Sequence, residues 1–397
     1  MRASVLTARQ LLLDCYRAAL DVVDARQCVR DALLRRPIHG DWHVIAVGKA
    51  AGAMAQGAIE ALGPRLSGGR VVVPPDHLPA GFAGDAHCLE VLVSSHPVPD
   101  ERSLVAGENV ATYVSSLAAD ARLLFLVSGG ASSLVETLRP GFSLADLQAL
   151  NHRALDSGVP IAEINARRRQ LSRLKGGGLA VLAGNRRTLA LMISDVPGDD
   201  PRVIGSGLLH AFAPSSELGP VPRVPVRTVA TLRMACRAGA DAARRHGLTA
   251  TVSPRRLAGD AAALGVALAT KARRLPARAL QVWGGESTVT LPVHPGRGGR
   301  NQHLALAAAI DFERRPSPVV LLAAGTDGID GSSTDAGAIV DSATCLRGRD
   351  AGFDPHVSLA AADSGSFLEA AGDLLHTGAT LTNVGDLVLA LGEQGAR

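Results

Sequence analysis

The residues best suited to chemistry lie just past short apolar runs of the sequence. Lys49, Asp195 and Glu286 each follow such a run by two or three residues, and Gly285 precedes Glu286. Another run ends in a loop of small residues, whose candidate ligand contacts are Ser128, Gly129, Gly130 and Ser132. Glycine lets backbone N–H groups approach a ligand, lysine supplies positive charge, and carboxylates hold Mg²⁺. Together these are the parts that phosphoryl transfer needs.

The stretch 319–341 concentrates carboxylates on a glycine-rich backbone. An apolar run ends at Gly325, and the aspartates that follow are Asp327, Asp330, Asp335 and Asp341. A turn, a metal site and part of an active site for a phosphorylated ligand each explain this composition. We expect Asp327 to contact phosphate or nucleotide, and Asp330 to ligate a metal together with Asp195. At least one of Asp327 and Asp330 should be essential, whereas Asp341 should be structural.

Two basic segments suggest anionic partners. The stretch 296–310 places Arg300 and Asn301 at an expected helix start, where a cation is unfavourable unless an anion lies close. The stretch 164–180 gathers Arg167, Arg168, Arg169, Arg173 and Lys175 within a few helical turns. This second group fits either a solvated helix face or a stripe that faces an anion.

Structural roles compete with these assignments. A Ser-Gly-Gly loop is a common turn, and Asp199 and Asp200 suit helix capping. His96 follows a strand without a second histidine at metal-ligand spacing, so a turn role is favoured over zinc. Lys49 is harder to explain structurally, because it is one of only three lysines among 41 basic residues.

Several common site motifs are missing. The sequence lacks GxxxxGK[ST], which excludes a P-loop NTPase, and it lacks HRD and DFG, which excludes a protein-kinase fold. GxGxxG is also absent, which counts against a dinucleotide site. The absence of GxSxG argues against an α/β-hydrolase.

The elements that must position these residues alternate along the chain. Apolar runs predict strands at 43–47, 70–73, 89–93, 122–127, 188–193, 249–253, 279–283 and 318–323. Amphipathic patterns predict helices at 49–62, 102–118, 143–156, 161–173, 230–245, 258–274 and 300–313. This alternation is typical of an α/β fold with mostly parallel, Rossmann-like sheets flanked by helices. The proline-rich stretch 210–227 suggests a boundary between domains 1–227 and 228–397.

Composition narrows the class of protein further. Of 397 residues, 47% are hydrophobic and only 3% aromatic, so the core is built mainly from small aliphatic side chains. The net charge of +4 is too weak to indicate nucleic-acid binding. The five cysteines form no CxxC, which fits a reducing cytoplasm. The first twenty residues predict an amphipathic helix rather than a signal peptide, and no transmembrane run is present.

The loops as a set resemble the glycerate 2-kinase family, the class II glycerate kinases with a C-terminal MOFRL domain. The matching motifs are GKAAGAM, SSHPVPDERS, LVSGGASSL, INARRRQLSRLKGGGLA, ISDVPGDDP, GGESTVT, GRGGRNQHLALA and AAGTDGIDGSSTDAGA. The resemblance implies ATP-dependent phosphorylation of D-glycerate at its 2-hydroxyl with Mg²⁺. It also implies two α/β domains with the active site in the cleft between them.

Carried over by motif, Lys49, Asp195 and Arg300 resemble the key residues of the family. Lys49 and Arg300 would hold a carboxylate or the transferring phosphoryl group. Asp195 would orient the 2-hydroxyl, accept its proton or ligate Mg²⁺. The chain departs from the family pattern at 206–212 and 376–387, which bears on substrate or nucleotide preference. An NAD(P)H-dependent hydroxypyruvate reductase and a non-catalytic binding module stay open as alternatives, as does a homodimer.

Overall fold

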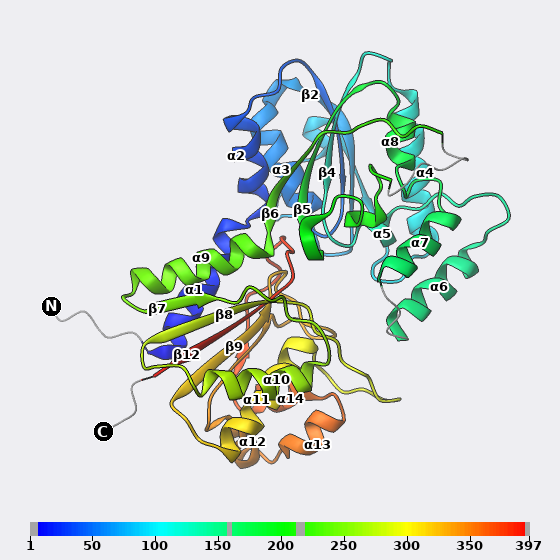
Figure 1. Ribbon diagram of the computed structural model, residues 1–397. Coiled ribbons are helices and arrows are strands. Elements are labelled where there is room, and N and C mark those ends of the chain that lie inside the picture. Colours follow the sequence, from blue (N-terminus) through cyan, green and yellow to red (C-terminus); the bar gives the residue numbers. More distant parts are fainter. Residues whose placement is uncertain (1–6, 157–160, 212–218, 394–397) are drawn as a thin grey trace. The chain divides into compact units, whose positions relative to one another are not determined.

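The computed structural model describes residues 7–156, 161–211 and 219–393 (Figure 1). The chain forms two compact units. The N-terminal unit comprises Asp24–Thr231 with Leu381–Asn383. The C-terminal unit comprises Met1–Val23, Leu232–Thr380 and Val384–Arg397. The change of unit at residue 232 lies close to the expected boundary, but the first helix belongs with the C-terminal unit and not with 1–227.

Six parallel strands form the sheet of the N-terminal unit. They are β1 (Trp42–Val47), β2 (Leu66–Val73), β3 (Leu89–Val93), β4 (Arg122–Val127), β5 (Arg187–Ser194) and β6 (Val226–Thr231). Their order in the sheet is β3-β2-β1-β4-β5-β6, which is the order of dinucleotide-binding folds. The expected parallel sheet is therefore confirmed here. The strand β6 was not expected, because it begins inside the proline-rich stretch 210–227. Residues 212–218 of that stretch lie outside the described part of the chain.

Helices cover both faces of this sheet (Figure 1). They are α2 (Ala25–Arg35), α3 (Ala51–Leu62), α4 (Glu101–Ser116), α5 (Ala131–Leu134) and α8 (Gly178–Ala183). The helices α6 (Leu144–Asp156) and α7 (Ile161–Leu171) pack against each other instead. The helix α4 begins where Asp100 accepts a hydrogen bond from Arg102 N at 2.8 Å. The inward faces of α4 and α8 pack on buried side chains of β1 and β4, such as Phe125. This apolar core fixes the strand ends from which the loops emerge.

The sheet of the C-terminal unit is mixed, and this corrects the expectation of mostly parallel pairing. Its strands are β7 (Thr249–Val252), β8 (Ala279–Gly285), β9 (Val319–Gly325), β10 (Gly337–Val340), β11 (Leu374–Leu375) and β12 (Asp386–Gly392), in the order β11-β10-β9-β12-β8-β7. Only β7 and β8 pair in parallel among these described strands. The reason is that β12 inserts between β8 and β9 in the opposite direction, while β10 returns beside β9 after the loop 326–336.

Seven helices accompany this second sheet in the described part of the chain. They are α1 (Ala8–Val22), α9 (Leu232–Arg245), α10 (Ala261–Ala272), α11 (Arg300–Arg314), α12 (Thr344–Asp350), α13 (Pro355–Ala360) and α14 (Ser364–Ala370). The helix α1 packs along α9, and its buried Tyr16 donates a hydrogen bond to Gly325 O at 2.6 Å. These contacts explain why the first residues join the C-terminal unit. Within the described residues, none of the helices is long and apolar enough to span a bilayer.

Candidate active site

The loops after β1 and β4 meet at the point where the strand order of the first sheet reverses. In open α/β sheets this topological switch point is where ligands bind. Lys49 N donates to Gly129 O at 2.9 Å, and Ser128 N donates to Val47 O at 3.1 Å. Gly48 has a φ of +135°, and a Cβ there would lie 2.8 Å from Ser128 O. A glycine is therefore required at residue 48 for the two loops to approach.

Ser128 holds these loops together from the inside. Its side chain is buried, and its Oγ accepts a hydrogen bond from Ala50 N at 3.0 Å. This geometry favours a structural role for the hydroxyl over the expected contact with phosphate. Ser132, two residues past Gly130, is half-buried and lies 3.4 Å from the guanidinium of Arg168.

Asp195, at the end of β5, faces the same loop. A Cβ on Gly129 would lie 2.8 Å from Cγ of Asp195, so the carboxylate sits directly against the glycine backbone. Asn383 Nδ2 lies 3.5 Å from Asp195 Oδ2. The chain segment Leu381–Asn383 belongs to the N-terminal unit although it is distant in sequence. Asn383 was missed by the sequence reasoning, and its position in a loop that departs from the family pattern was the available signal.

Lys49 and His96 both lie close to the next glycine. Gly130 has a φ of +83°, and a Cβ on it would lie 3.0 Å from the His96 ring and 3.2 Å from Cγ of Lys49. The structure therefore brings Lys49, Asp195 and the Gly129–Gly130 loop together, as their places at strand ends predicted. His96 also lies beside this loop, although the sequence predicted only a turn role for it. Its place after the strand 89–93 was the signal that could have identified it.

Arg300 lies at the N-terminus of α11 and contacts two carboxylates of its own unit. Its Nε and Nη2 donate to Asp386 at 2.6 and 3.0 Å, and Nη1 lies 2.9 Å from Glu286 Oε1. Burial lowers the pKa of Arg300, but attraction by Asp386 and Glu286 outweighs burial and leaves that pKa raised. The anionic partner expected for Arg300 is thus present within the chain. Asp386 was not identified from the sequence, because it lies 86 residues away.

Asp330 binds the first turn of α11. Its Oδ1 accepts from the backbone N and side-chain Nδ2 of Asn301, both at 3.1 Å, and its Oδ2 accepts from Gln302 N at 2.8 Å. Burial raises the pKa of Asp330 to about 7. Both carboxylate oxygens are occupied by N–H donors, so the geometry favours helix capping for Asp330 and Asn301 over the expected contacts with metal and phosphate.

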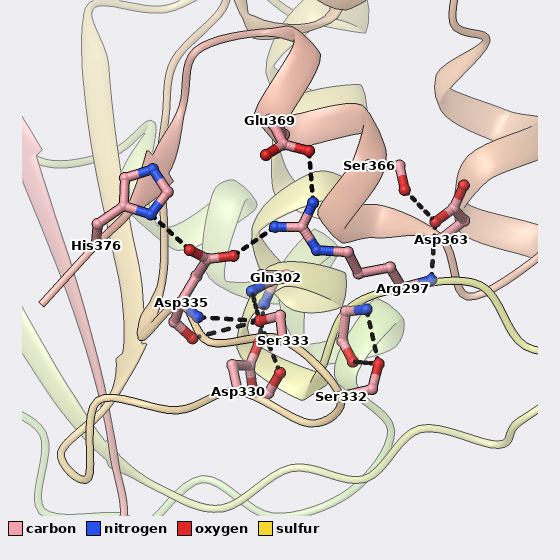
Figure 2. A network of polar contacts seen from close by, with 11 residues as sticks. Arg297, Gln302, Asp330, Ser332, Ser333, Asp335, Asp363, Ser366, Glu369 and His376 are labelled. Atoms are coloured by element: carbon pink, nitrogen blue, oxygen red, sulfur yellow. Dashed lines mark hydrogen bonds and ion pairs between the residues drawn. The ribbon is translucent and has the colours of Figure 1, made fainter. Parts of the chain in front are cut away.

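The other aspartates of 319–341 also have partners within the C-terminal unit. Asp335 lies between His376 and Arg297 (Figure 2). Its carboxylate oxygens are 2.5 Å from His376 Nδ1 and 2.8 Å from Arg297 Nη2. Asp341 forms ion pairs with Arg9 and Arg347, which fits the structural role expected for it. Asp327 Oδ1 accepts from Ile329 N at 3.3 Å, as in a turn.

The groups that could hold a metal are few. Within the described ranges, no three histidine, cysteine, aspartate or glutamate side chains gather around one point. Magnesium needs only one or two protein carboxylates when phosphates and water supply the remaining ligands. The half-buried carboxylate of Asp195 fits that requirement, whereas the fully occupied carboxylate of Asp330 does not. Asp200 forms a surface pair with Arg202.

Comparison with known proteins gives the family. Residues 11–217 match a domain of unknown function, DUF4147, and residues 279–386 match the MOFRL family. A D-glycerate 2-kinase of Thermotoga maritima is 34% identical, covering 96% of this chain and 98% of the relative. A protein of Agrobacterium vitis, provisionally named hydroxypyruvate reductase, is 37% identical over 96% of this chain and 94% of its own length.

The fold agrees with these sequence matches. A crystal structure of glycerate kinase from Thermotoga maritima superposes with a TM-score of 0.83 at 33% identity, covering 96% of this chain and 99% of the other. This level of identity over nearly the whole length exceeds what a shared fold alone would give. The chain belongs to the glycerate 2-kinase family.

Proposed function

We propose that the protein is a glycerate 2-kinase, which transfers a phosphoryl group from ATP to the 2-hydroxyl of D-glycerate and releases 2-phosphoglycerate and ADP. One observation supports this most strongly. In a chain of this family, Lys49 and Asp195 lie against the Gly129–Gly130 loop at the switch point of the first sheet. A cation, a carboxylate and exposed loop backbone are the groups that phosphoryl transfer requires.

The two side chains divide the chemistry between them. The 2-hydroxyl oxygen attacks the terminal phosphorus of ATP, the bond to the ADP oxygen breaks, and the hydroxyl proton passes to the Asp195 carboxylate. Lys49 stabilises the negative charge on the transferring group. The half-buried positions of both residues combine access for a ligand with partial exclusion of water. His96 lies against Gly130 of the loop, and Asn383 lies beside the carboxylate of Asp195.

Magnesium bound with ATP would neutralise phosphate charge during transfer. Contact of the Asp195 carboxylate with such an ion is the alternative to its role as proton acceptor. We propose that the backbone N–H groups of Gly129 and Gly130 bind a phosphate of the nucleotide. Gly285 and Asp327 are further candidates for contact with the nucleotide.

Arg300 has a separate proposed role in anion binding. Its contacts with Asp386 are bidentate and Asp386 is buried, but Glu286 is 51% exposed. A carboxylate or phosphate of a ligand can therefore replace Glu286 on Nη1 while Asp386 keeps the guanidinium in place. Arg300 is positioned for a planar, charge-assisted contact, which lysine would not reproduce.

Reduction of hydroxypyruvate is the second candidate, because a relative carries that name and the strand order matches dinucleotide folds. Against it, the first loop reads GKAAGAM and lacks the glycine pattern that accommodates a pyrophosphate.

We propose a cytoplasmic enzyme that acts on small molecules, with a homodimer as one assembly to test by light scattering.

The test measures ADP directly by chromatography in the presence of ATP, Mg²⁺ and D-glycerate. ADP release should require D-glycerate. Its rate should fall by roughly 10²-fold or more in Lys49→Met and should stay unchanged in Lys271→Met. Lys271 is an exposed lysine on α10 and serves as the matched control. Absence of ADP together with oxidation of NADH or NADPH by hydroxypyruvate would overturn the proposal.

A further inference from the structure

Arg168 on α7 is a basic residue that has no role in the proposed mechanism. Its Nη2 donates to Asn151 Oδ1 on α6, and its Nη1 lies 3.4 Å from Ser132 Oγ. Its Nε is buried and has no hydrogen-bond partner among the described residues. A guanidinium has five N–H donors, and a buried donor without a partner is costly. This side chain is therefore held in place but incompletely satisfied.

The charges around Arg168 do not balance. Glu136 is the carboxylate that acts on it electrostatically, and Glu136 is already paired with Lys175. The side chains of that pair are 1% and 0% exposed, respectively. Two cations thus share one carboxylate, and burial lowers the pKa of both Arg168 and Lys175. Within the part of the chain that the structure describes, Arg168 has no ion pair of its own. An anion bound here would offset the excess positive charge.

The partners of Arg168 connect it to the candidate active site. Ser132 lies on α5, the short helix that begins directly after Gly129 and Gly130. Asn151 is buried, and its Nδ2 donates to Leu147 O at 2.8 Å, which orients its Oδ1 toward the guanidinium. The hydroxyl of Ser132, only half-buried, can donate to an incoming anion. Arg168 therefore contacts the helix that directly follows the loop against which Asp195 and Lys49 lie.

We propose that Arg168, with Ser132, binds an anionic oxygen group of a substrate beside the Gly129–Gly130 loop, and that Asn151 positions the guanidinium. The ligand chemistry is a carboxylate or a phosphate, because both match the planar fork of arginine. Two sources meet this description under the proposed function, the carboxylate of D-glycerate and a phosphate of ATP. The inference rests on that proposed function, and the two are separated experimentally below.

The main experiment compares Arg168→Gln with Arg167→Gln. Arg167 is an exposed neighbour on the same helix and carries the same charge. In Arg168→Gln we expect the KM for one substrate to rise about 10- to 100-fold, as for loss of a charge-assisted contact. A rise for D-glycerate identifies the carboxylate, and a rise for ATP identifies a phosphate. Arg167→Gln should leave both KM values unchanged.

Two further variants separate binding from stability. Arg168→Lys keeps the charge without the planar fork, so its KM should lie between those of wild type and Arg168→Gln. Ser132→Ala removes only a hydroxyl and should raise the same KM by a few-fold. If the Arg168 variants melt at lower temperature but keep both KM values, the residue is structural and the inference is wrong.

Direct binding distinguishes this inference from the proposed function. Wild-type protein should be stabilised against heat by D-glycerate or by ATP, and Arg168→Gln should lose most of that stabilisation for one of the two. This readout needs no turnover. If the wild-type protein has no kinase activity, and Arg168→Gln still abolishes the stabilisation by one ligand, the proposed reaction is refuted and the anion site is supported. Equal stabilisation of both proteins by each ligand would refute the site.

Discussion

Asp195 and Asp200 are five residues apart in the sequence and have opposite surroundings. Asp195 lies against Gly129 and beside Asn383. Asp200 accepts hydrogen bonds from Arg202 at 2.6 to 3.0 Å, and these contacts lower its pKa. The proposed function gives the proton transfer to Asp195, whereas the carboxylate of Asp200 is paired with Arg202.

We therefore expect Asp195→Asn to lower kcat by roughly 10²- to 10⁴-fold, as for loss of a general base. The amide keeps the size of the side chain but does not accept the proton. Steady-state kinetics with D-glycerate and ATP would measure this change, with Asp200→Asn as the matched control. Equal turnover of Asp195→Asn and wild type would contradict the proposed role.

The sequence predicted some of these residues and not others for a physical reason. Lys49 and Asp195 lie at the ends of parallel strands, and such ends share one edge of a sheet, so their proximity follows from local patterns. Asn383 and Asp386 act through contacts with residues far along the chain. No local pattern encodes such a contact, so the partner that Arg300 has in the structure was not foreseen.

At the scale of elements, the pair Lys175–Glu136 ties the segment after α7 to the segment after α5. Glu136 Oε1 also accepts from Thr137 N at 3.0 Å, and Ser172 Oγ accepts from Lys175 N at 3.1 Å. Both charged side chains are removed from water. Removing Lys175 alone leaves the buried Glu136 carboxylate without its hydrogen-bonded cation, which is more costly than removing both groups of the pair.

Lys175→Met should destabilise the N-terminal unit by about 3–5 kcal/mol, and Lys175→Met with Glu136→Leu should recover part of that loss. The chain has two tryptophans, Trp42 on β1 and Trp283 on β8. In a Trp283→Phe background, the fluorescence of Trp42 during urea unfolding reports on the N-terminal unit alone. A double variant less stable than Lys175→Met would contradict this account.

The first turn of α11 makes the C-terminal unit sensitive to pH. Burial raises the pKa of Asp330 from an ordinary value near 3.8 to about 7. Between these values the folded protein keeps a proton that the unfolded chain has released. Stability from this group is therefore fully present below pH 3.8 and is lost as the pH rises through about 7.

Asp330→Asn should remove this dependence, so that the variant loses less stability than wild type between pH 4 and pH 7 (the range set by Asp330). Urea unfolding in a Trp42→Phe background, read by Trp283, would measure it. A wild-type stability that rises with pH across this range, with the variant unchanged, would show that the helix N-terminus holds an ionised carboxylate instead.

The strands show how far element prediction reaches. All eight expected strands are present. Most of them are buried apolar runs, whereas β3 and β7 are partly exposed strands at the edges of their sheets. The strands that were missed are β6, β10, β11 and β12. The strand β11 has only two residues, too few to leave a pattern. Strand direction was not readable, because a buried run looks the same whether its neighbour is parallel or antiparallel.

At the scale of the whole molecule, α1 joins the C-terminal unit although it precedes the N-terminal unit in sequence. Leu12 on α1 is fully buried, and Arg9 pairs with Asp341 and Asp373. The expected boundary at 227 assumed one continuous segment for each domain. Packing of α1 on α9 overrides that assumption, and sequence patterns alone do not encode it.

Leu12→Ala should therefore destabilise the unit reported by Trp283, by about 2–5 kcal/mol, and leave the transition of Trp42 unchanged. Leu33→Ala, at a buried position of α2, should do the reverse. Single-tryptophan backgrounds followed in urea would separate the two signals. A shift in the Trp42 transition by Leu12→Ala would instead support the continuous domain 1–227.

The central claim concerns the reaction and its position on the substrate. The most direct measurement supplies ATP, Mg²⁺, D-glycerate and enolase to the purified protein without phosphoglycerate mutase. We predict immediate formation of phosphoenolpyruvate, in step with ADP, because enolase acts on 2-phosphoglycerate. Phosphoenolpyruvate that forms only after mutase is added would place the phosphate on the 3-hydroxyl, and absence of ADP would contradict the kinase assignment itself.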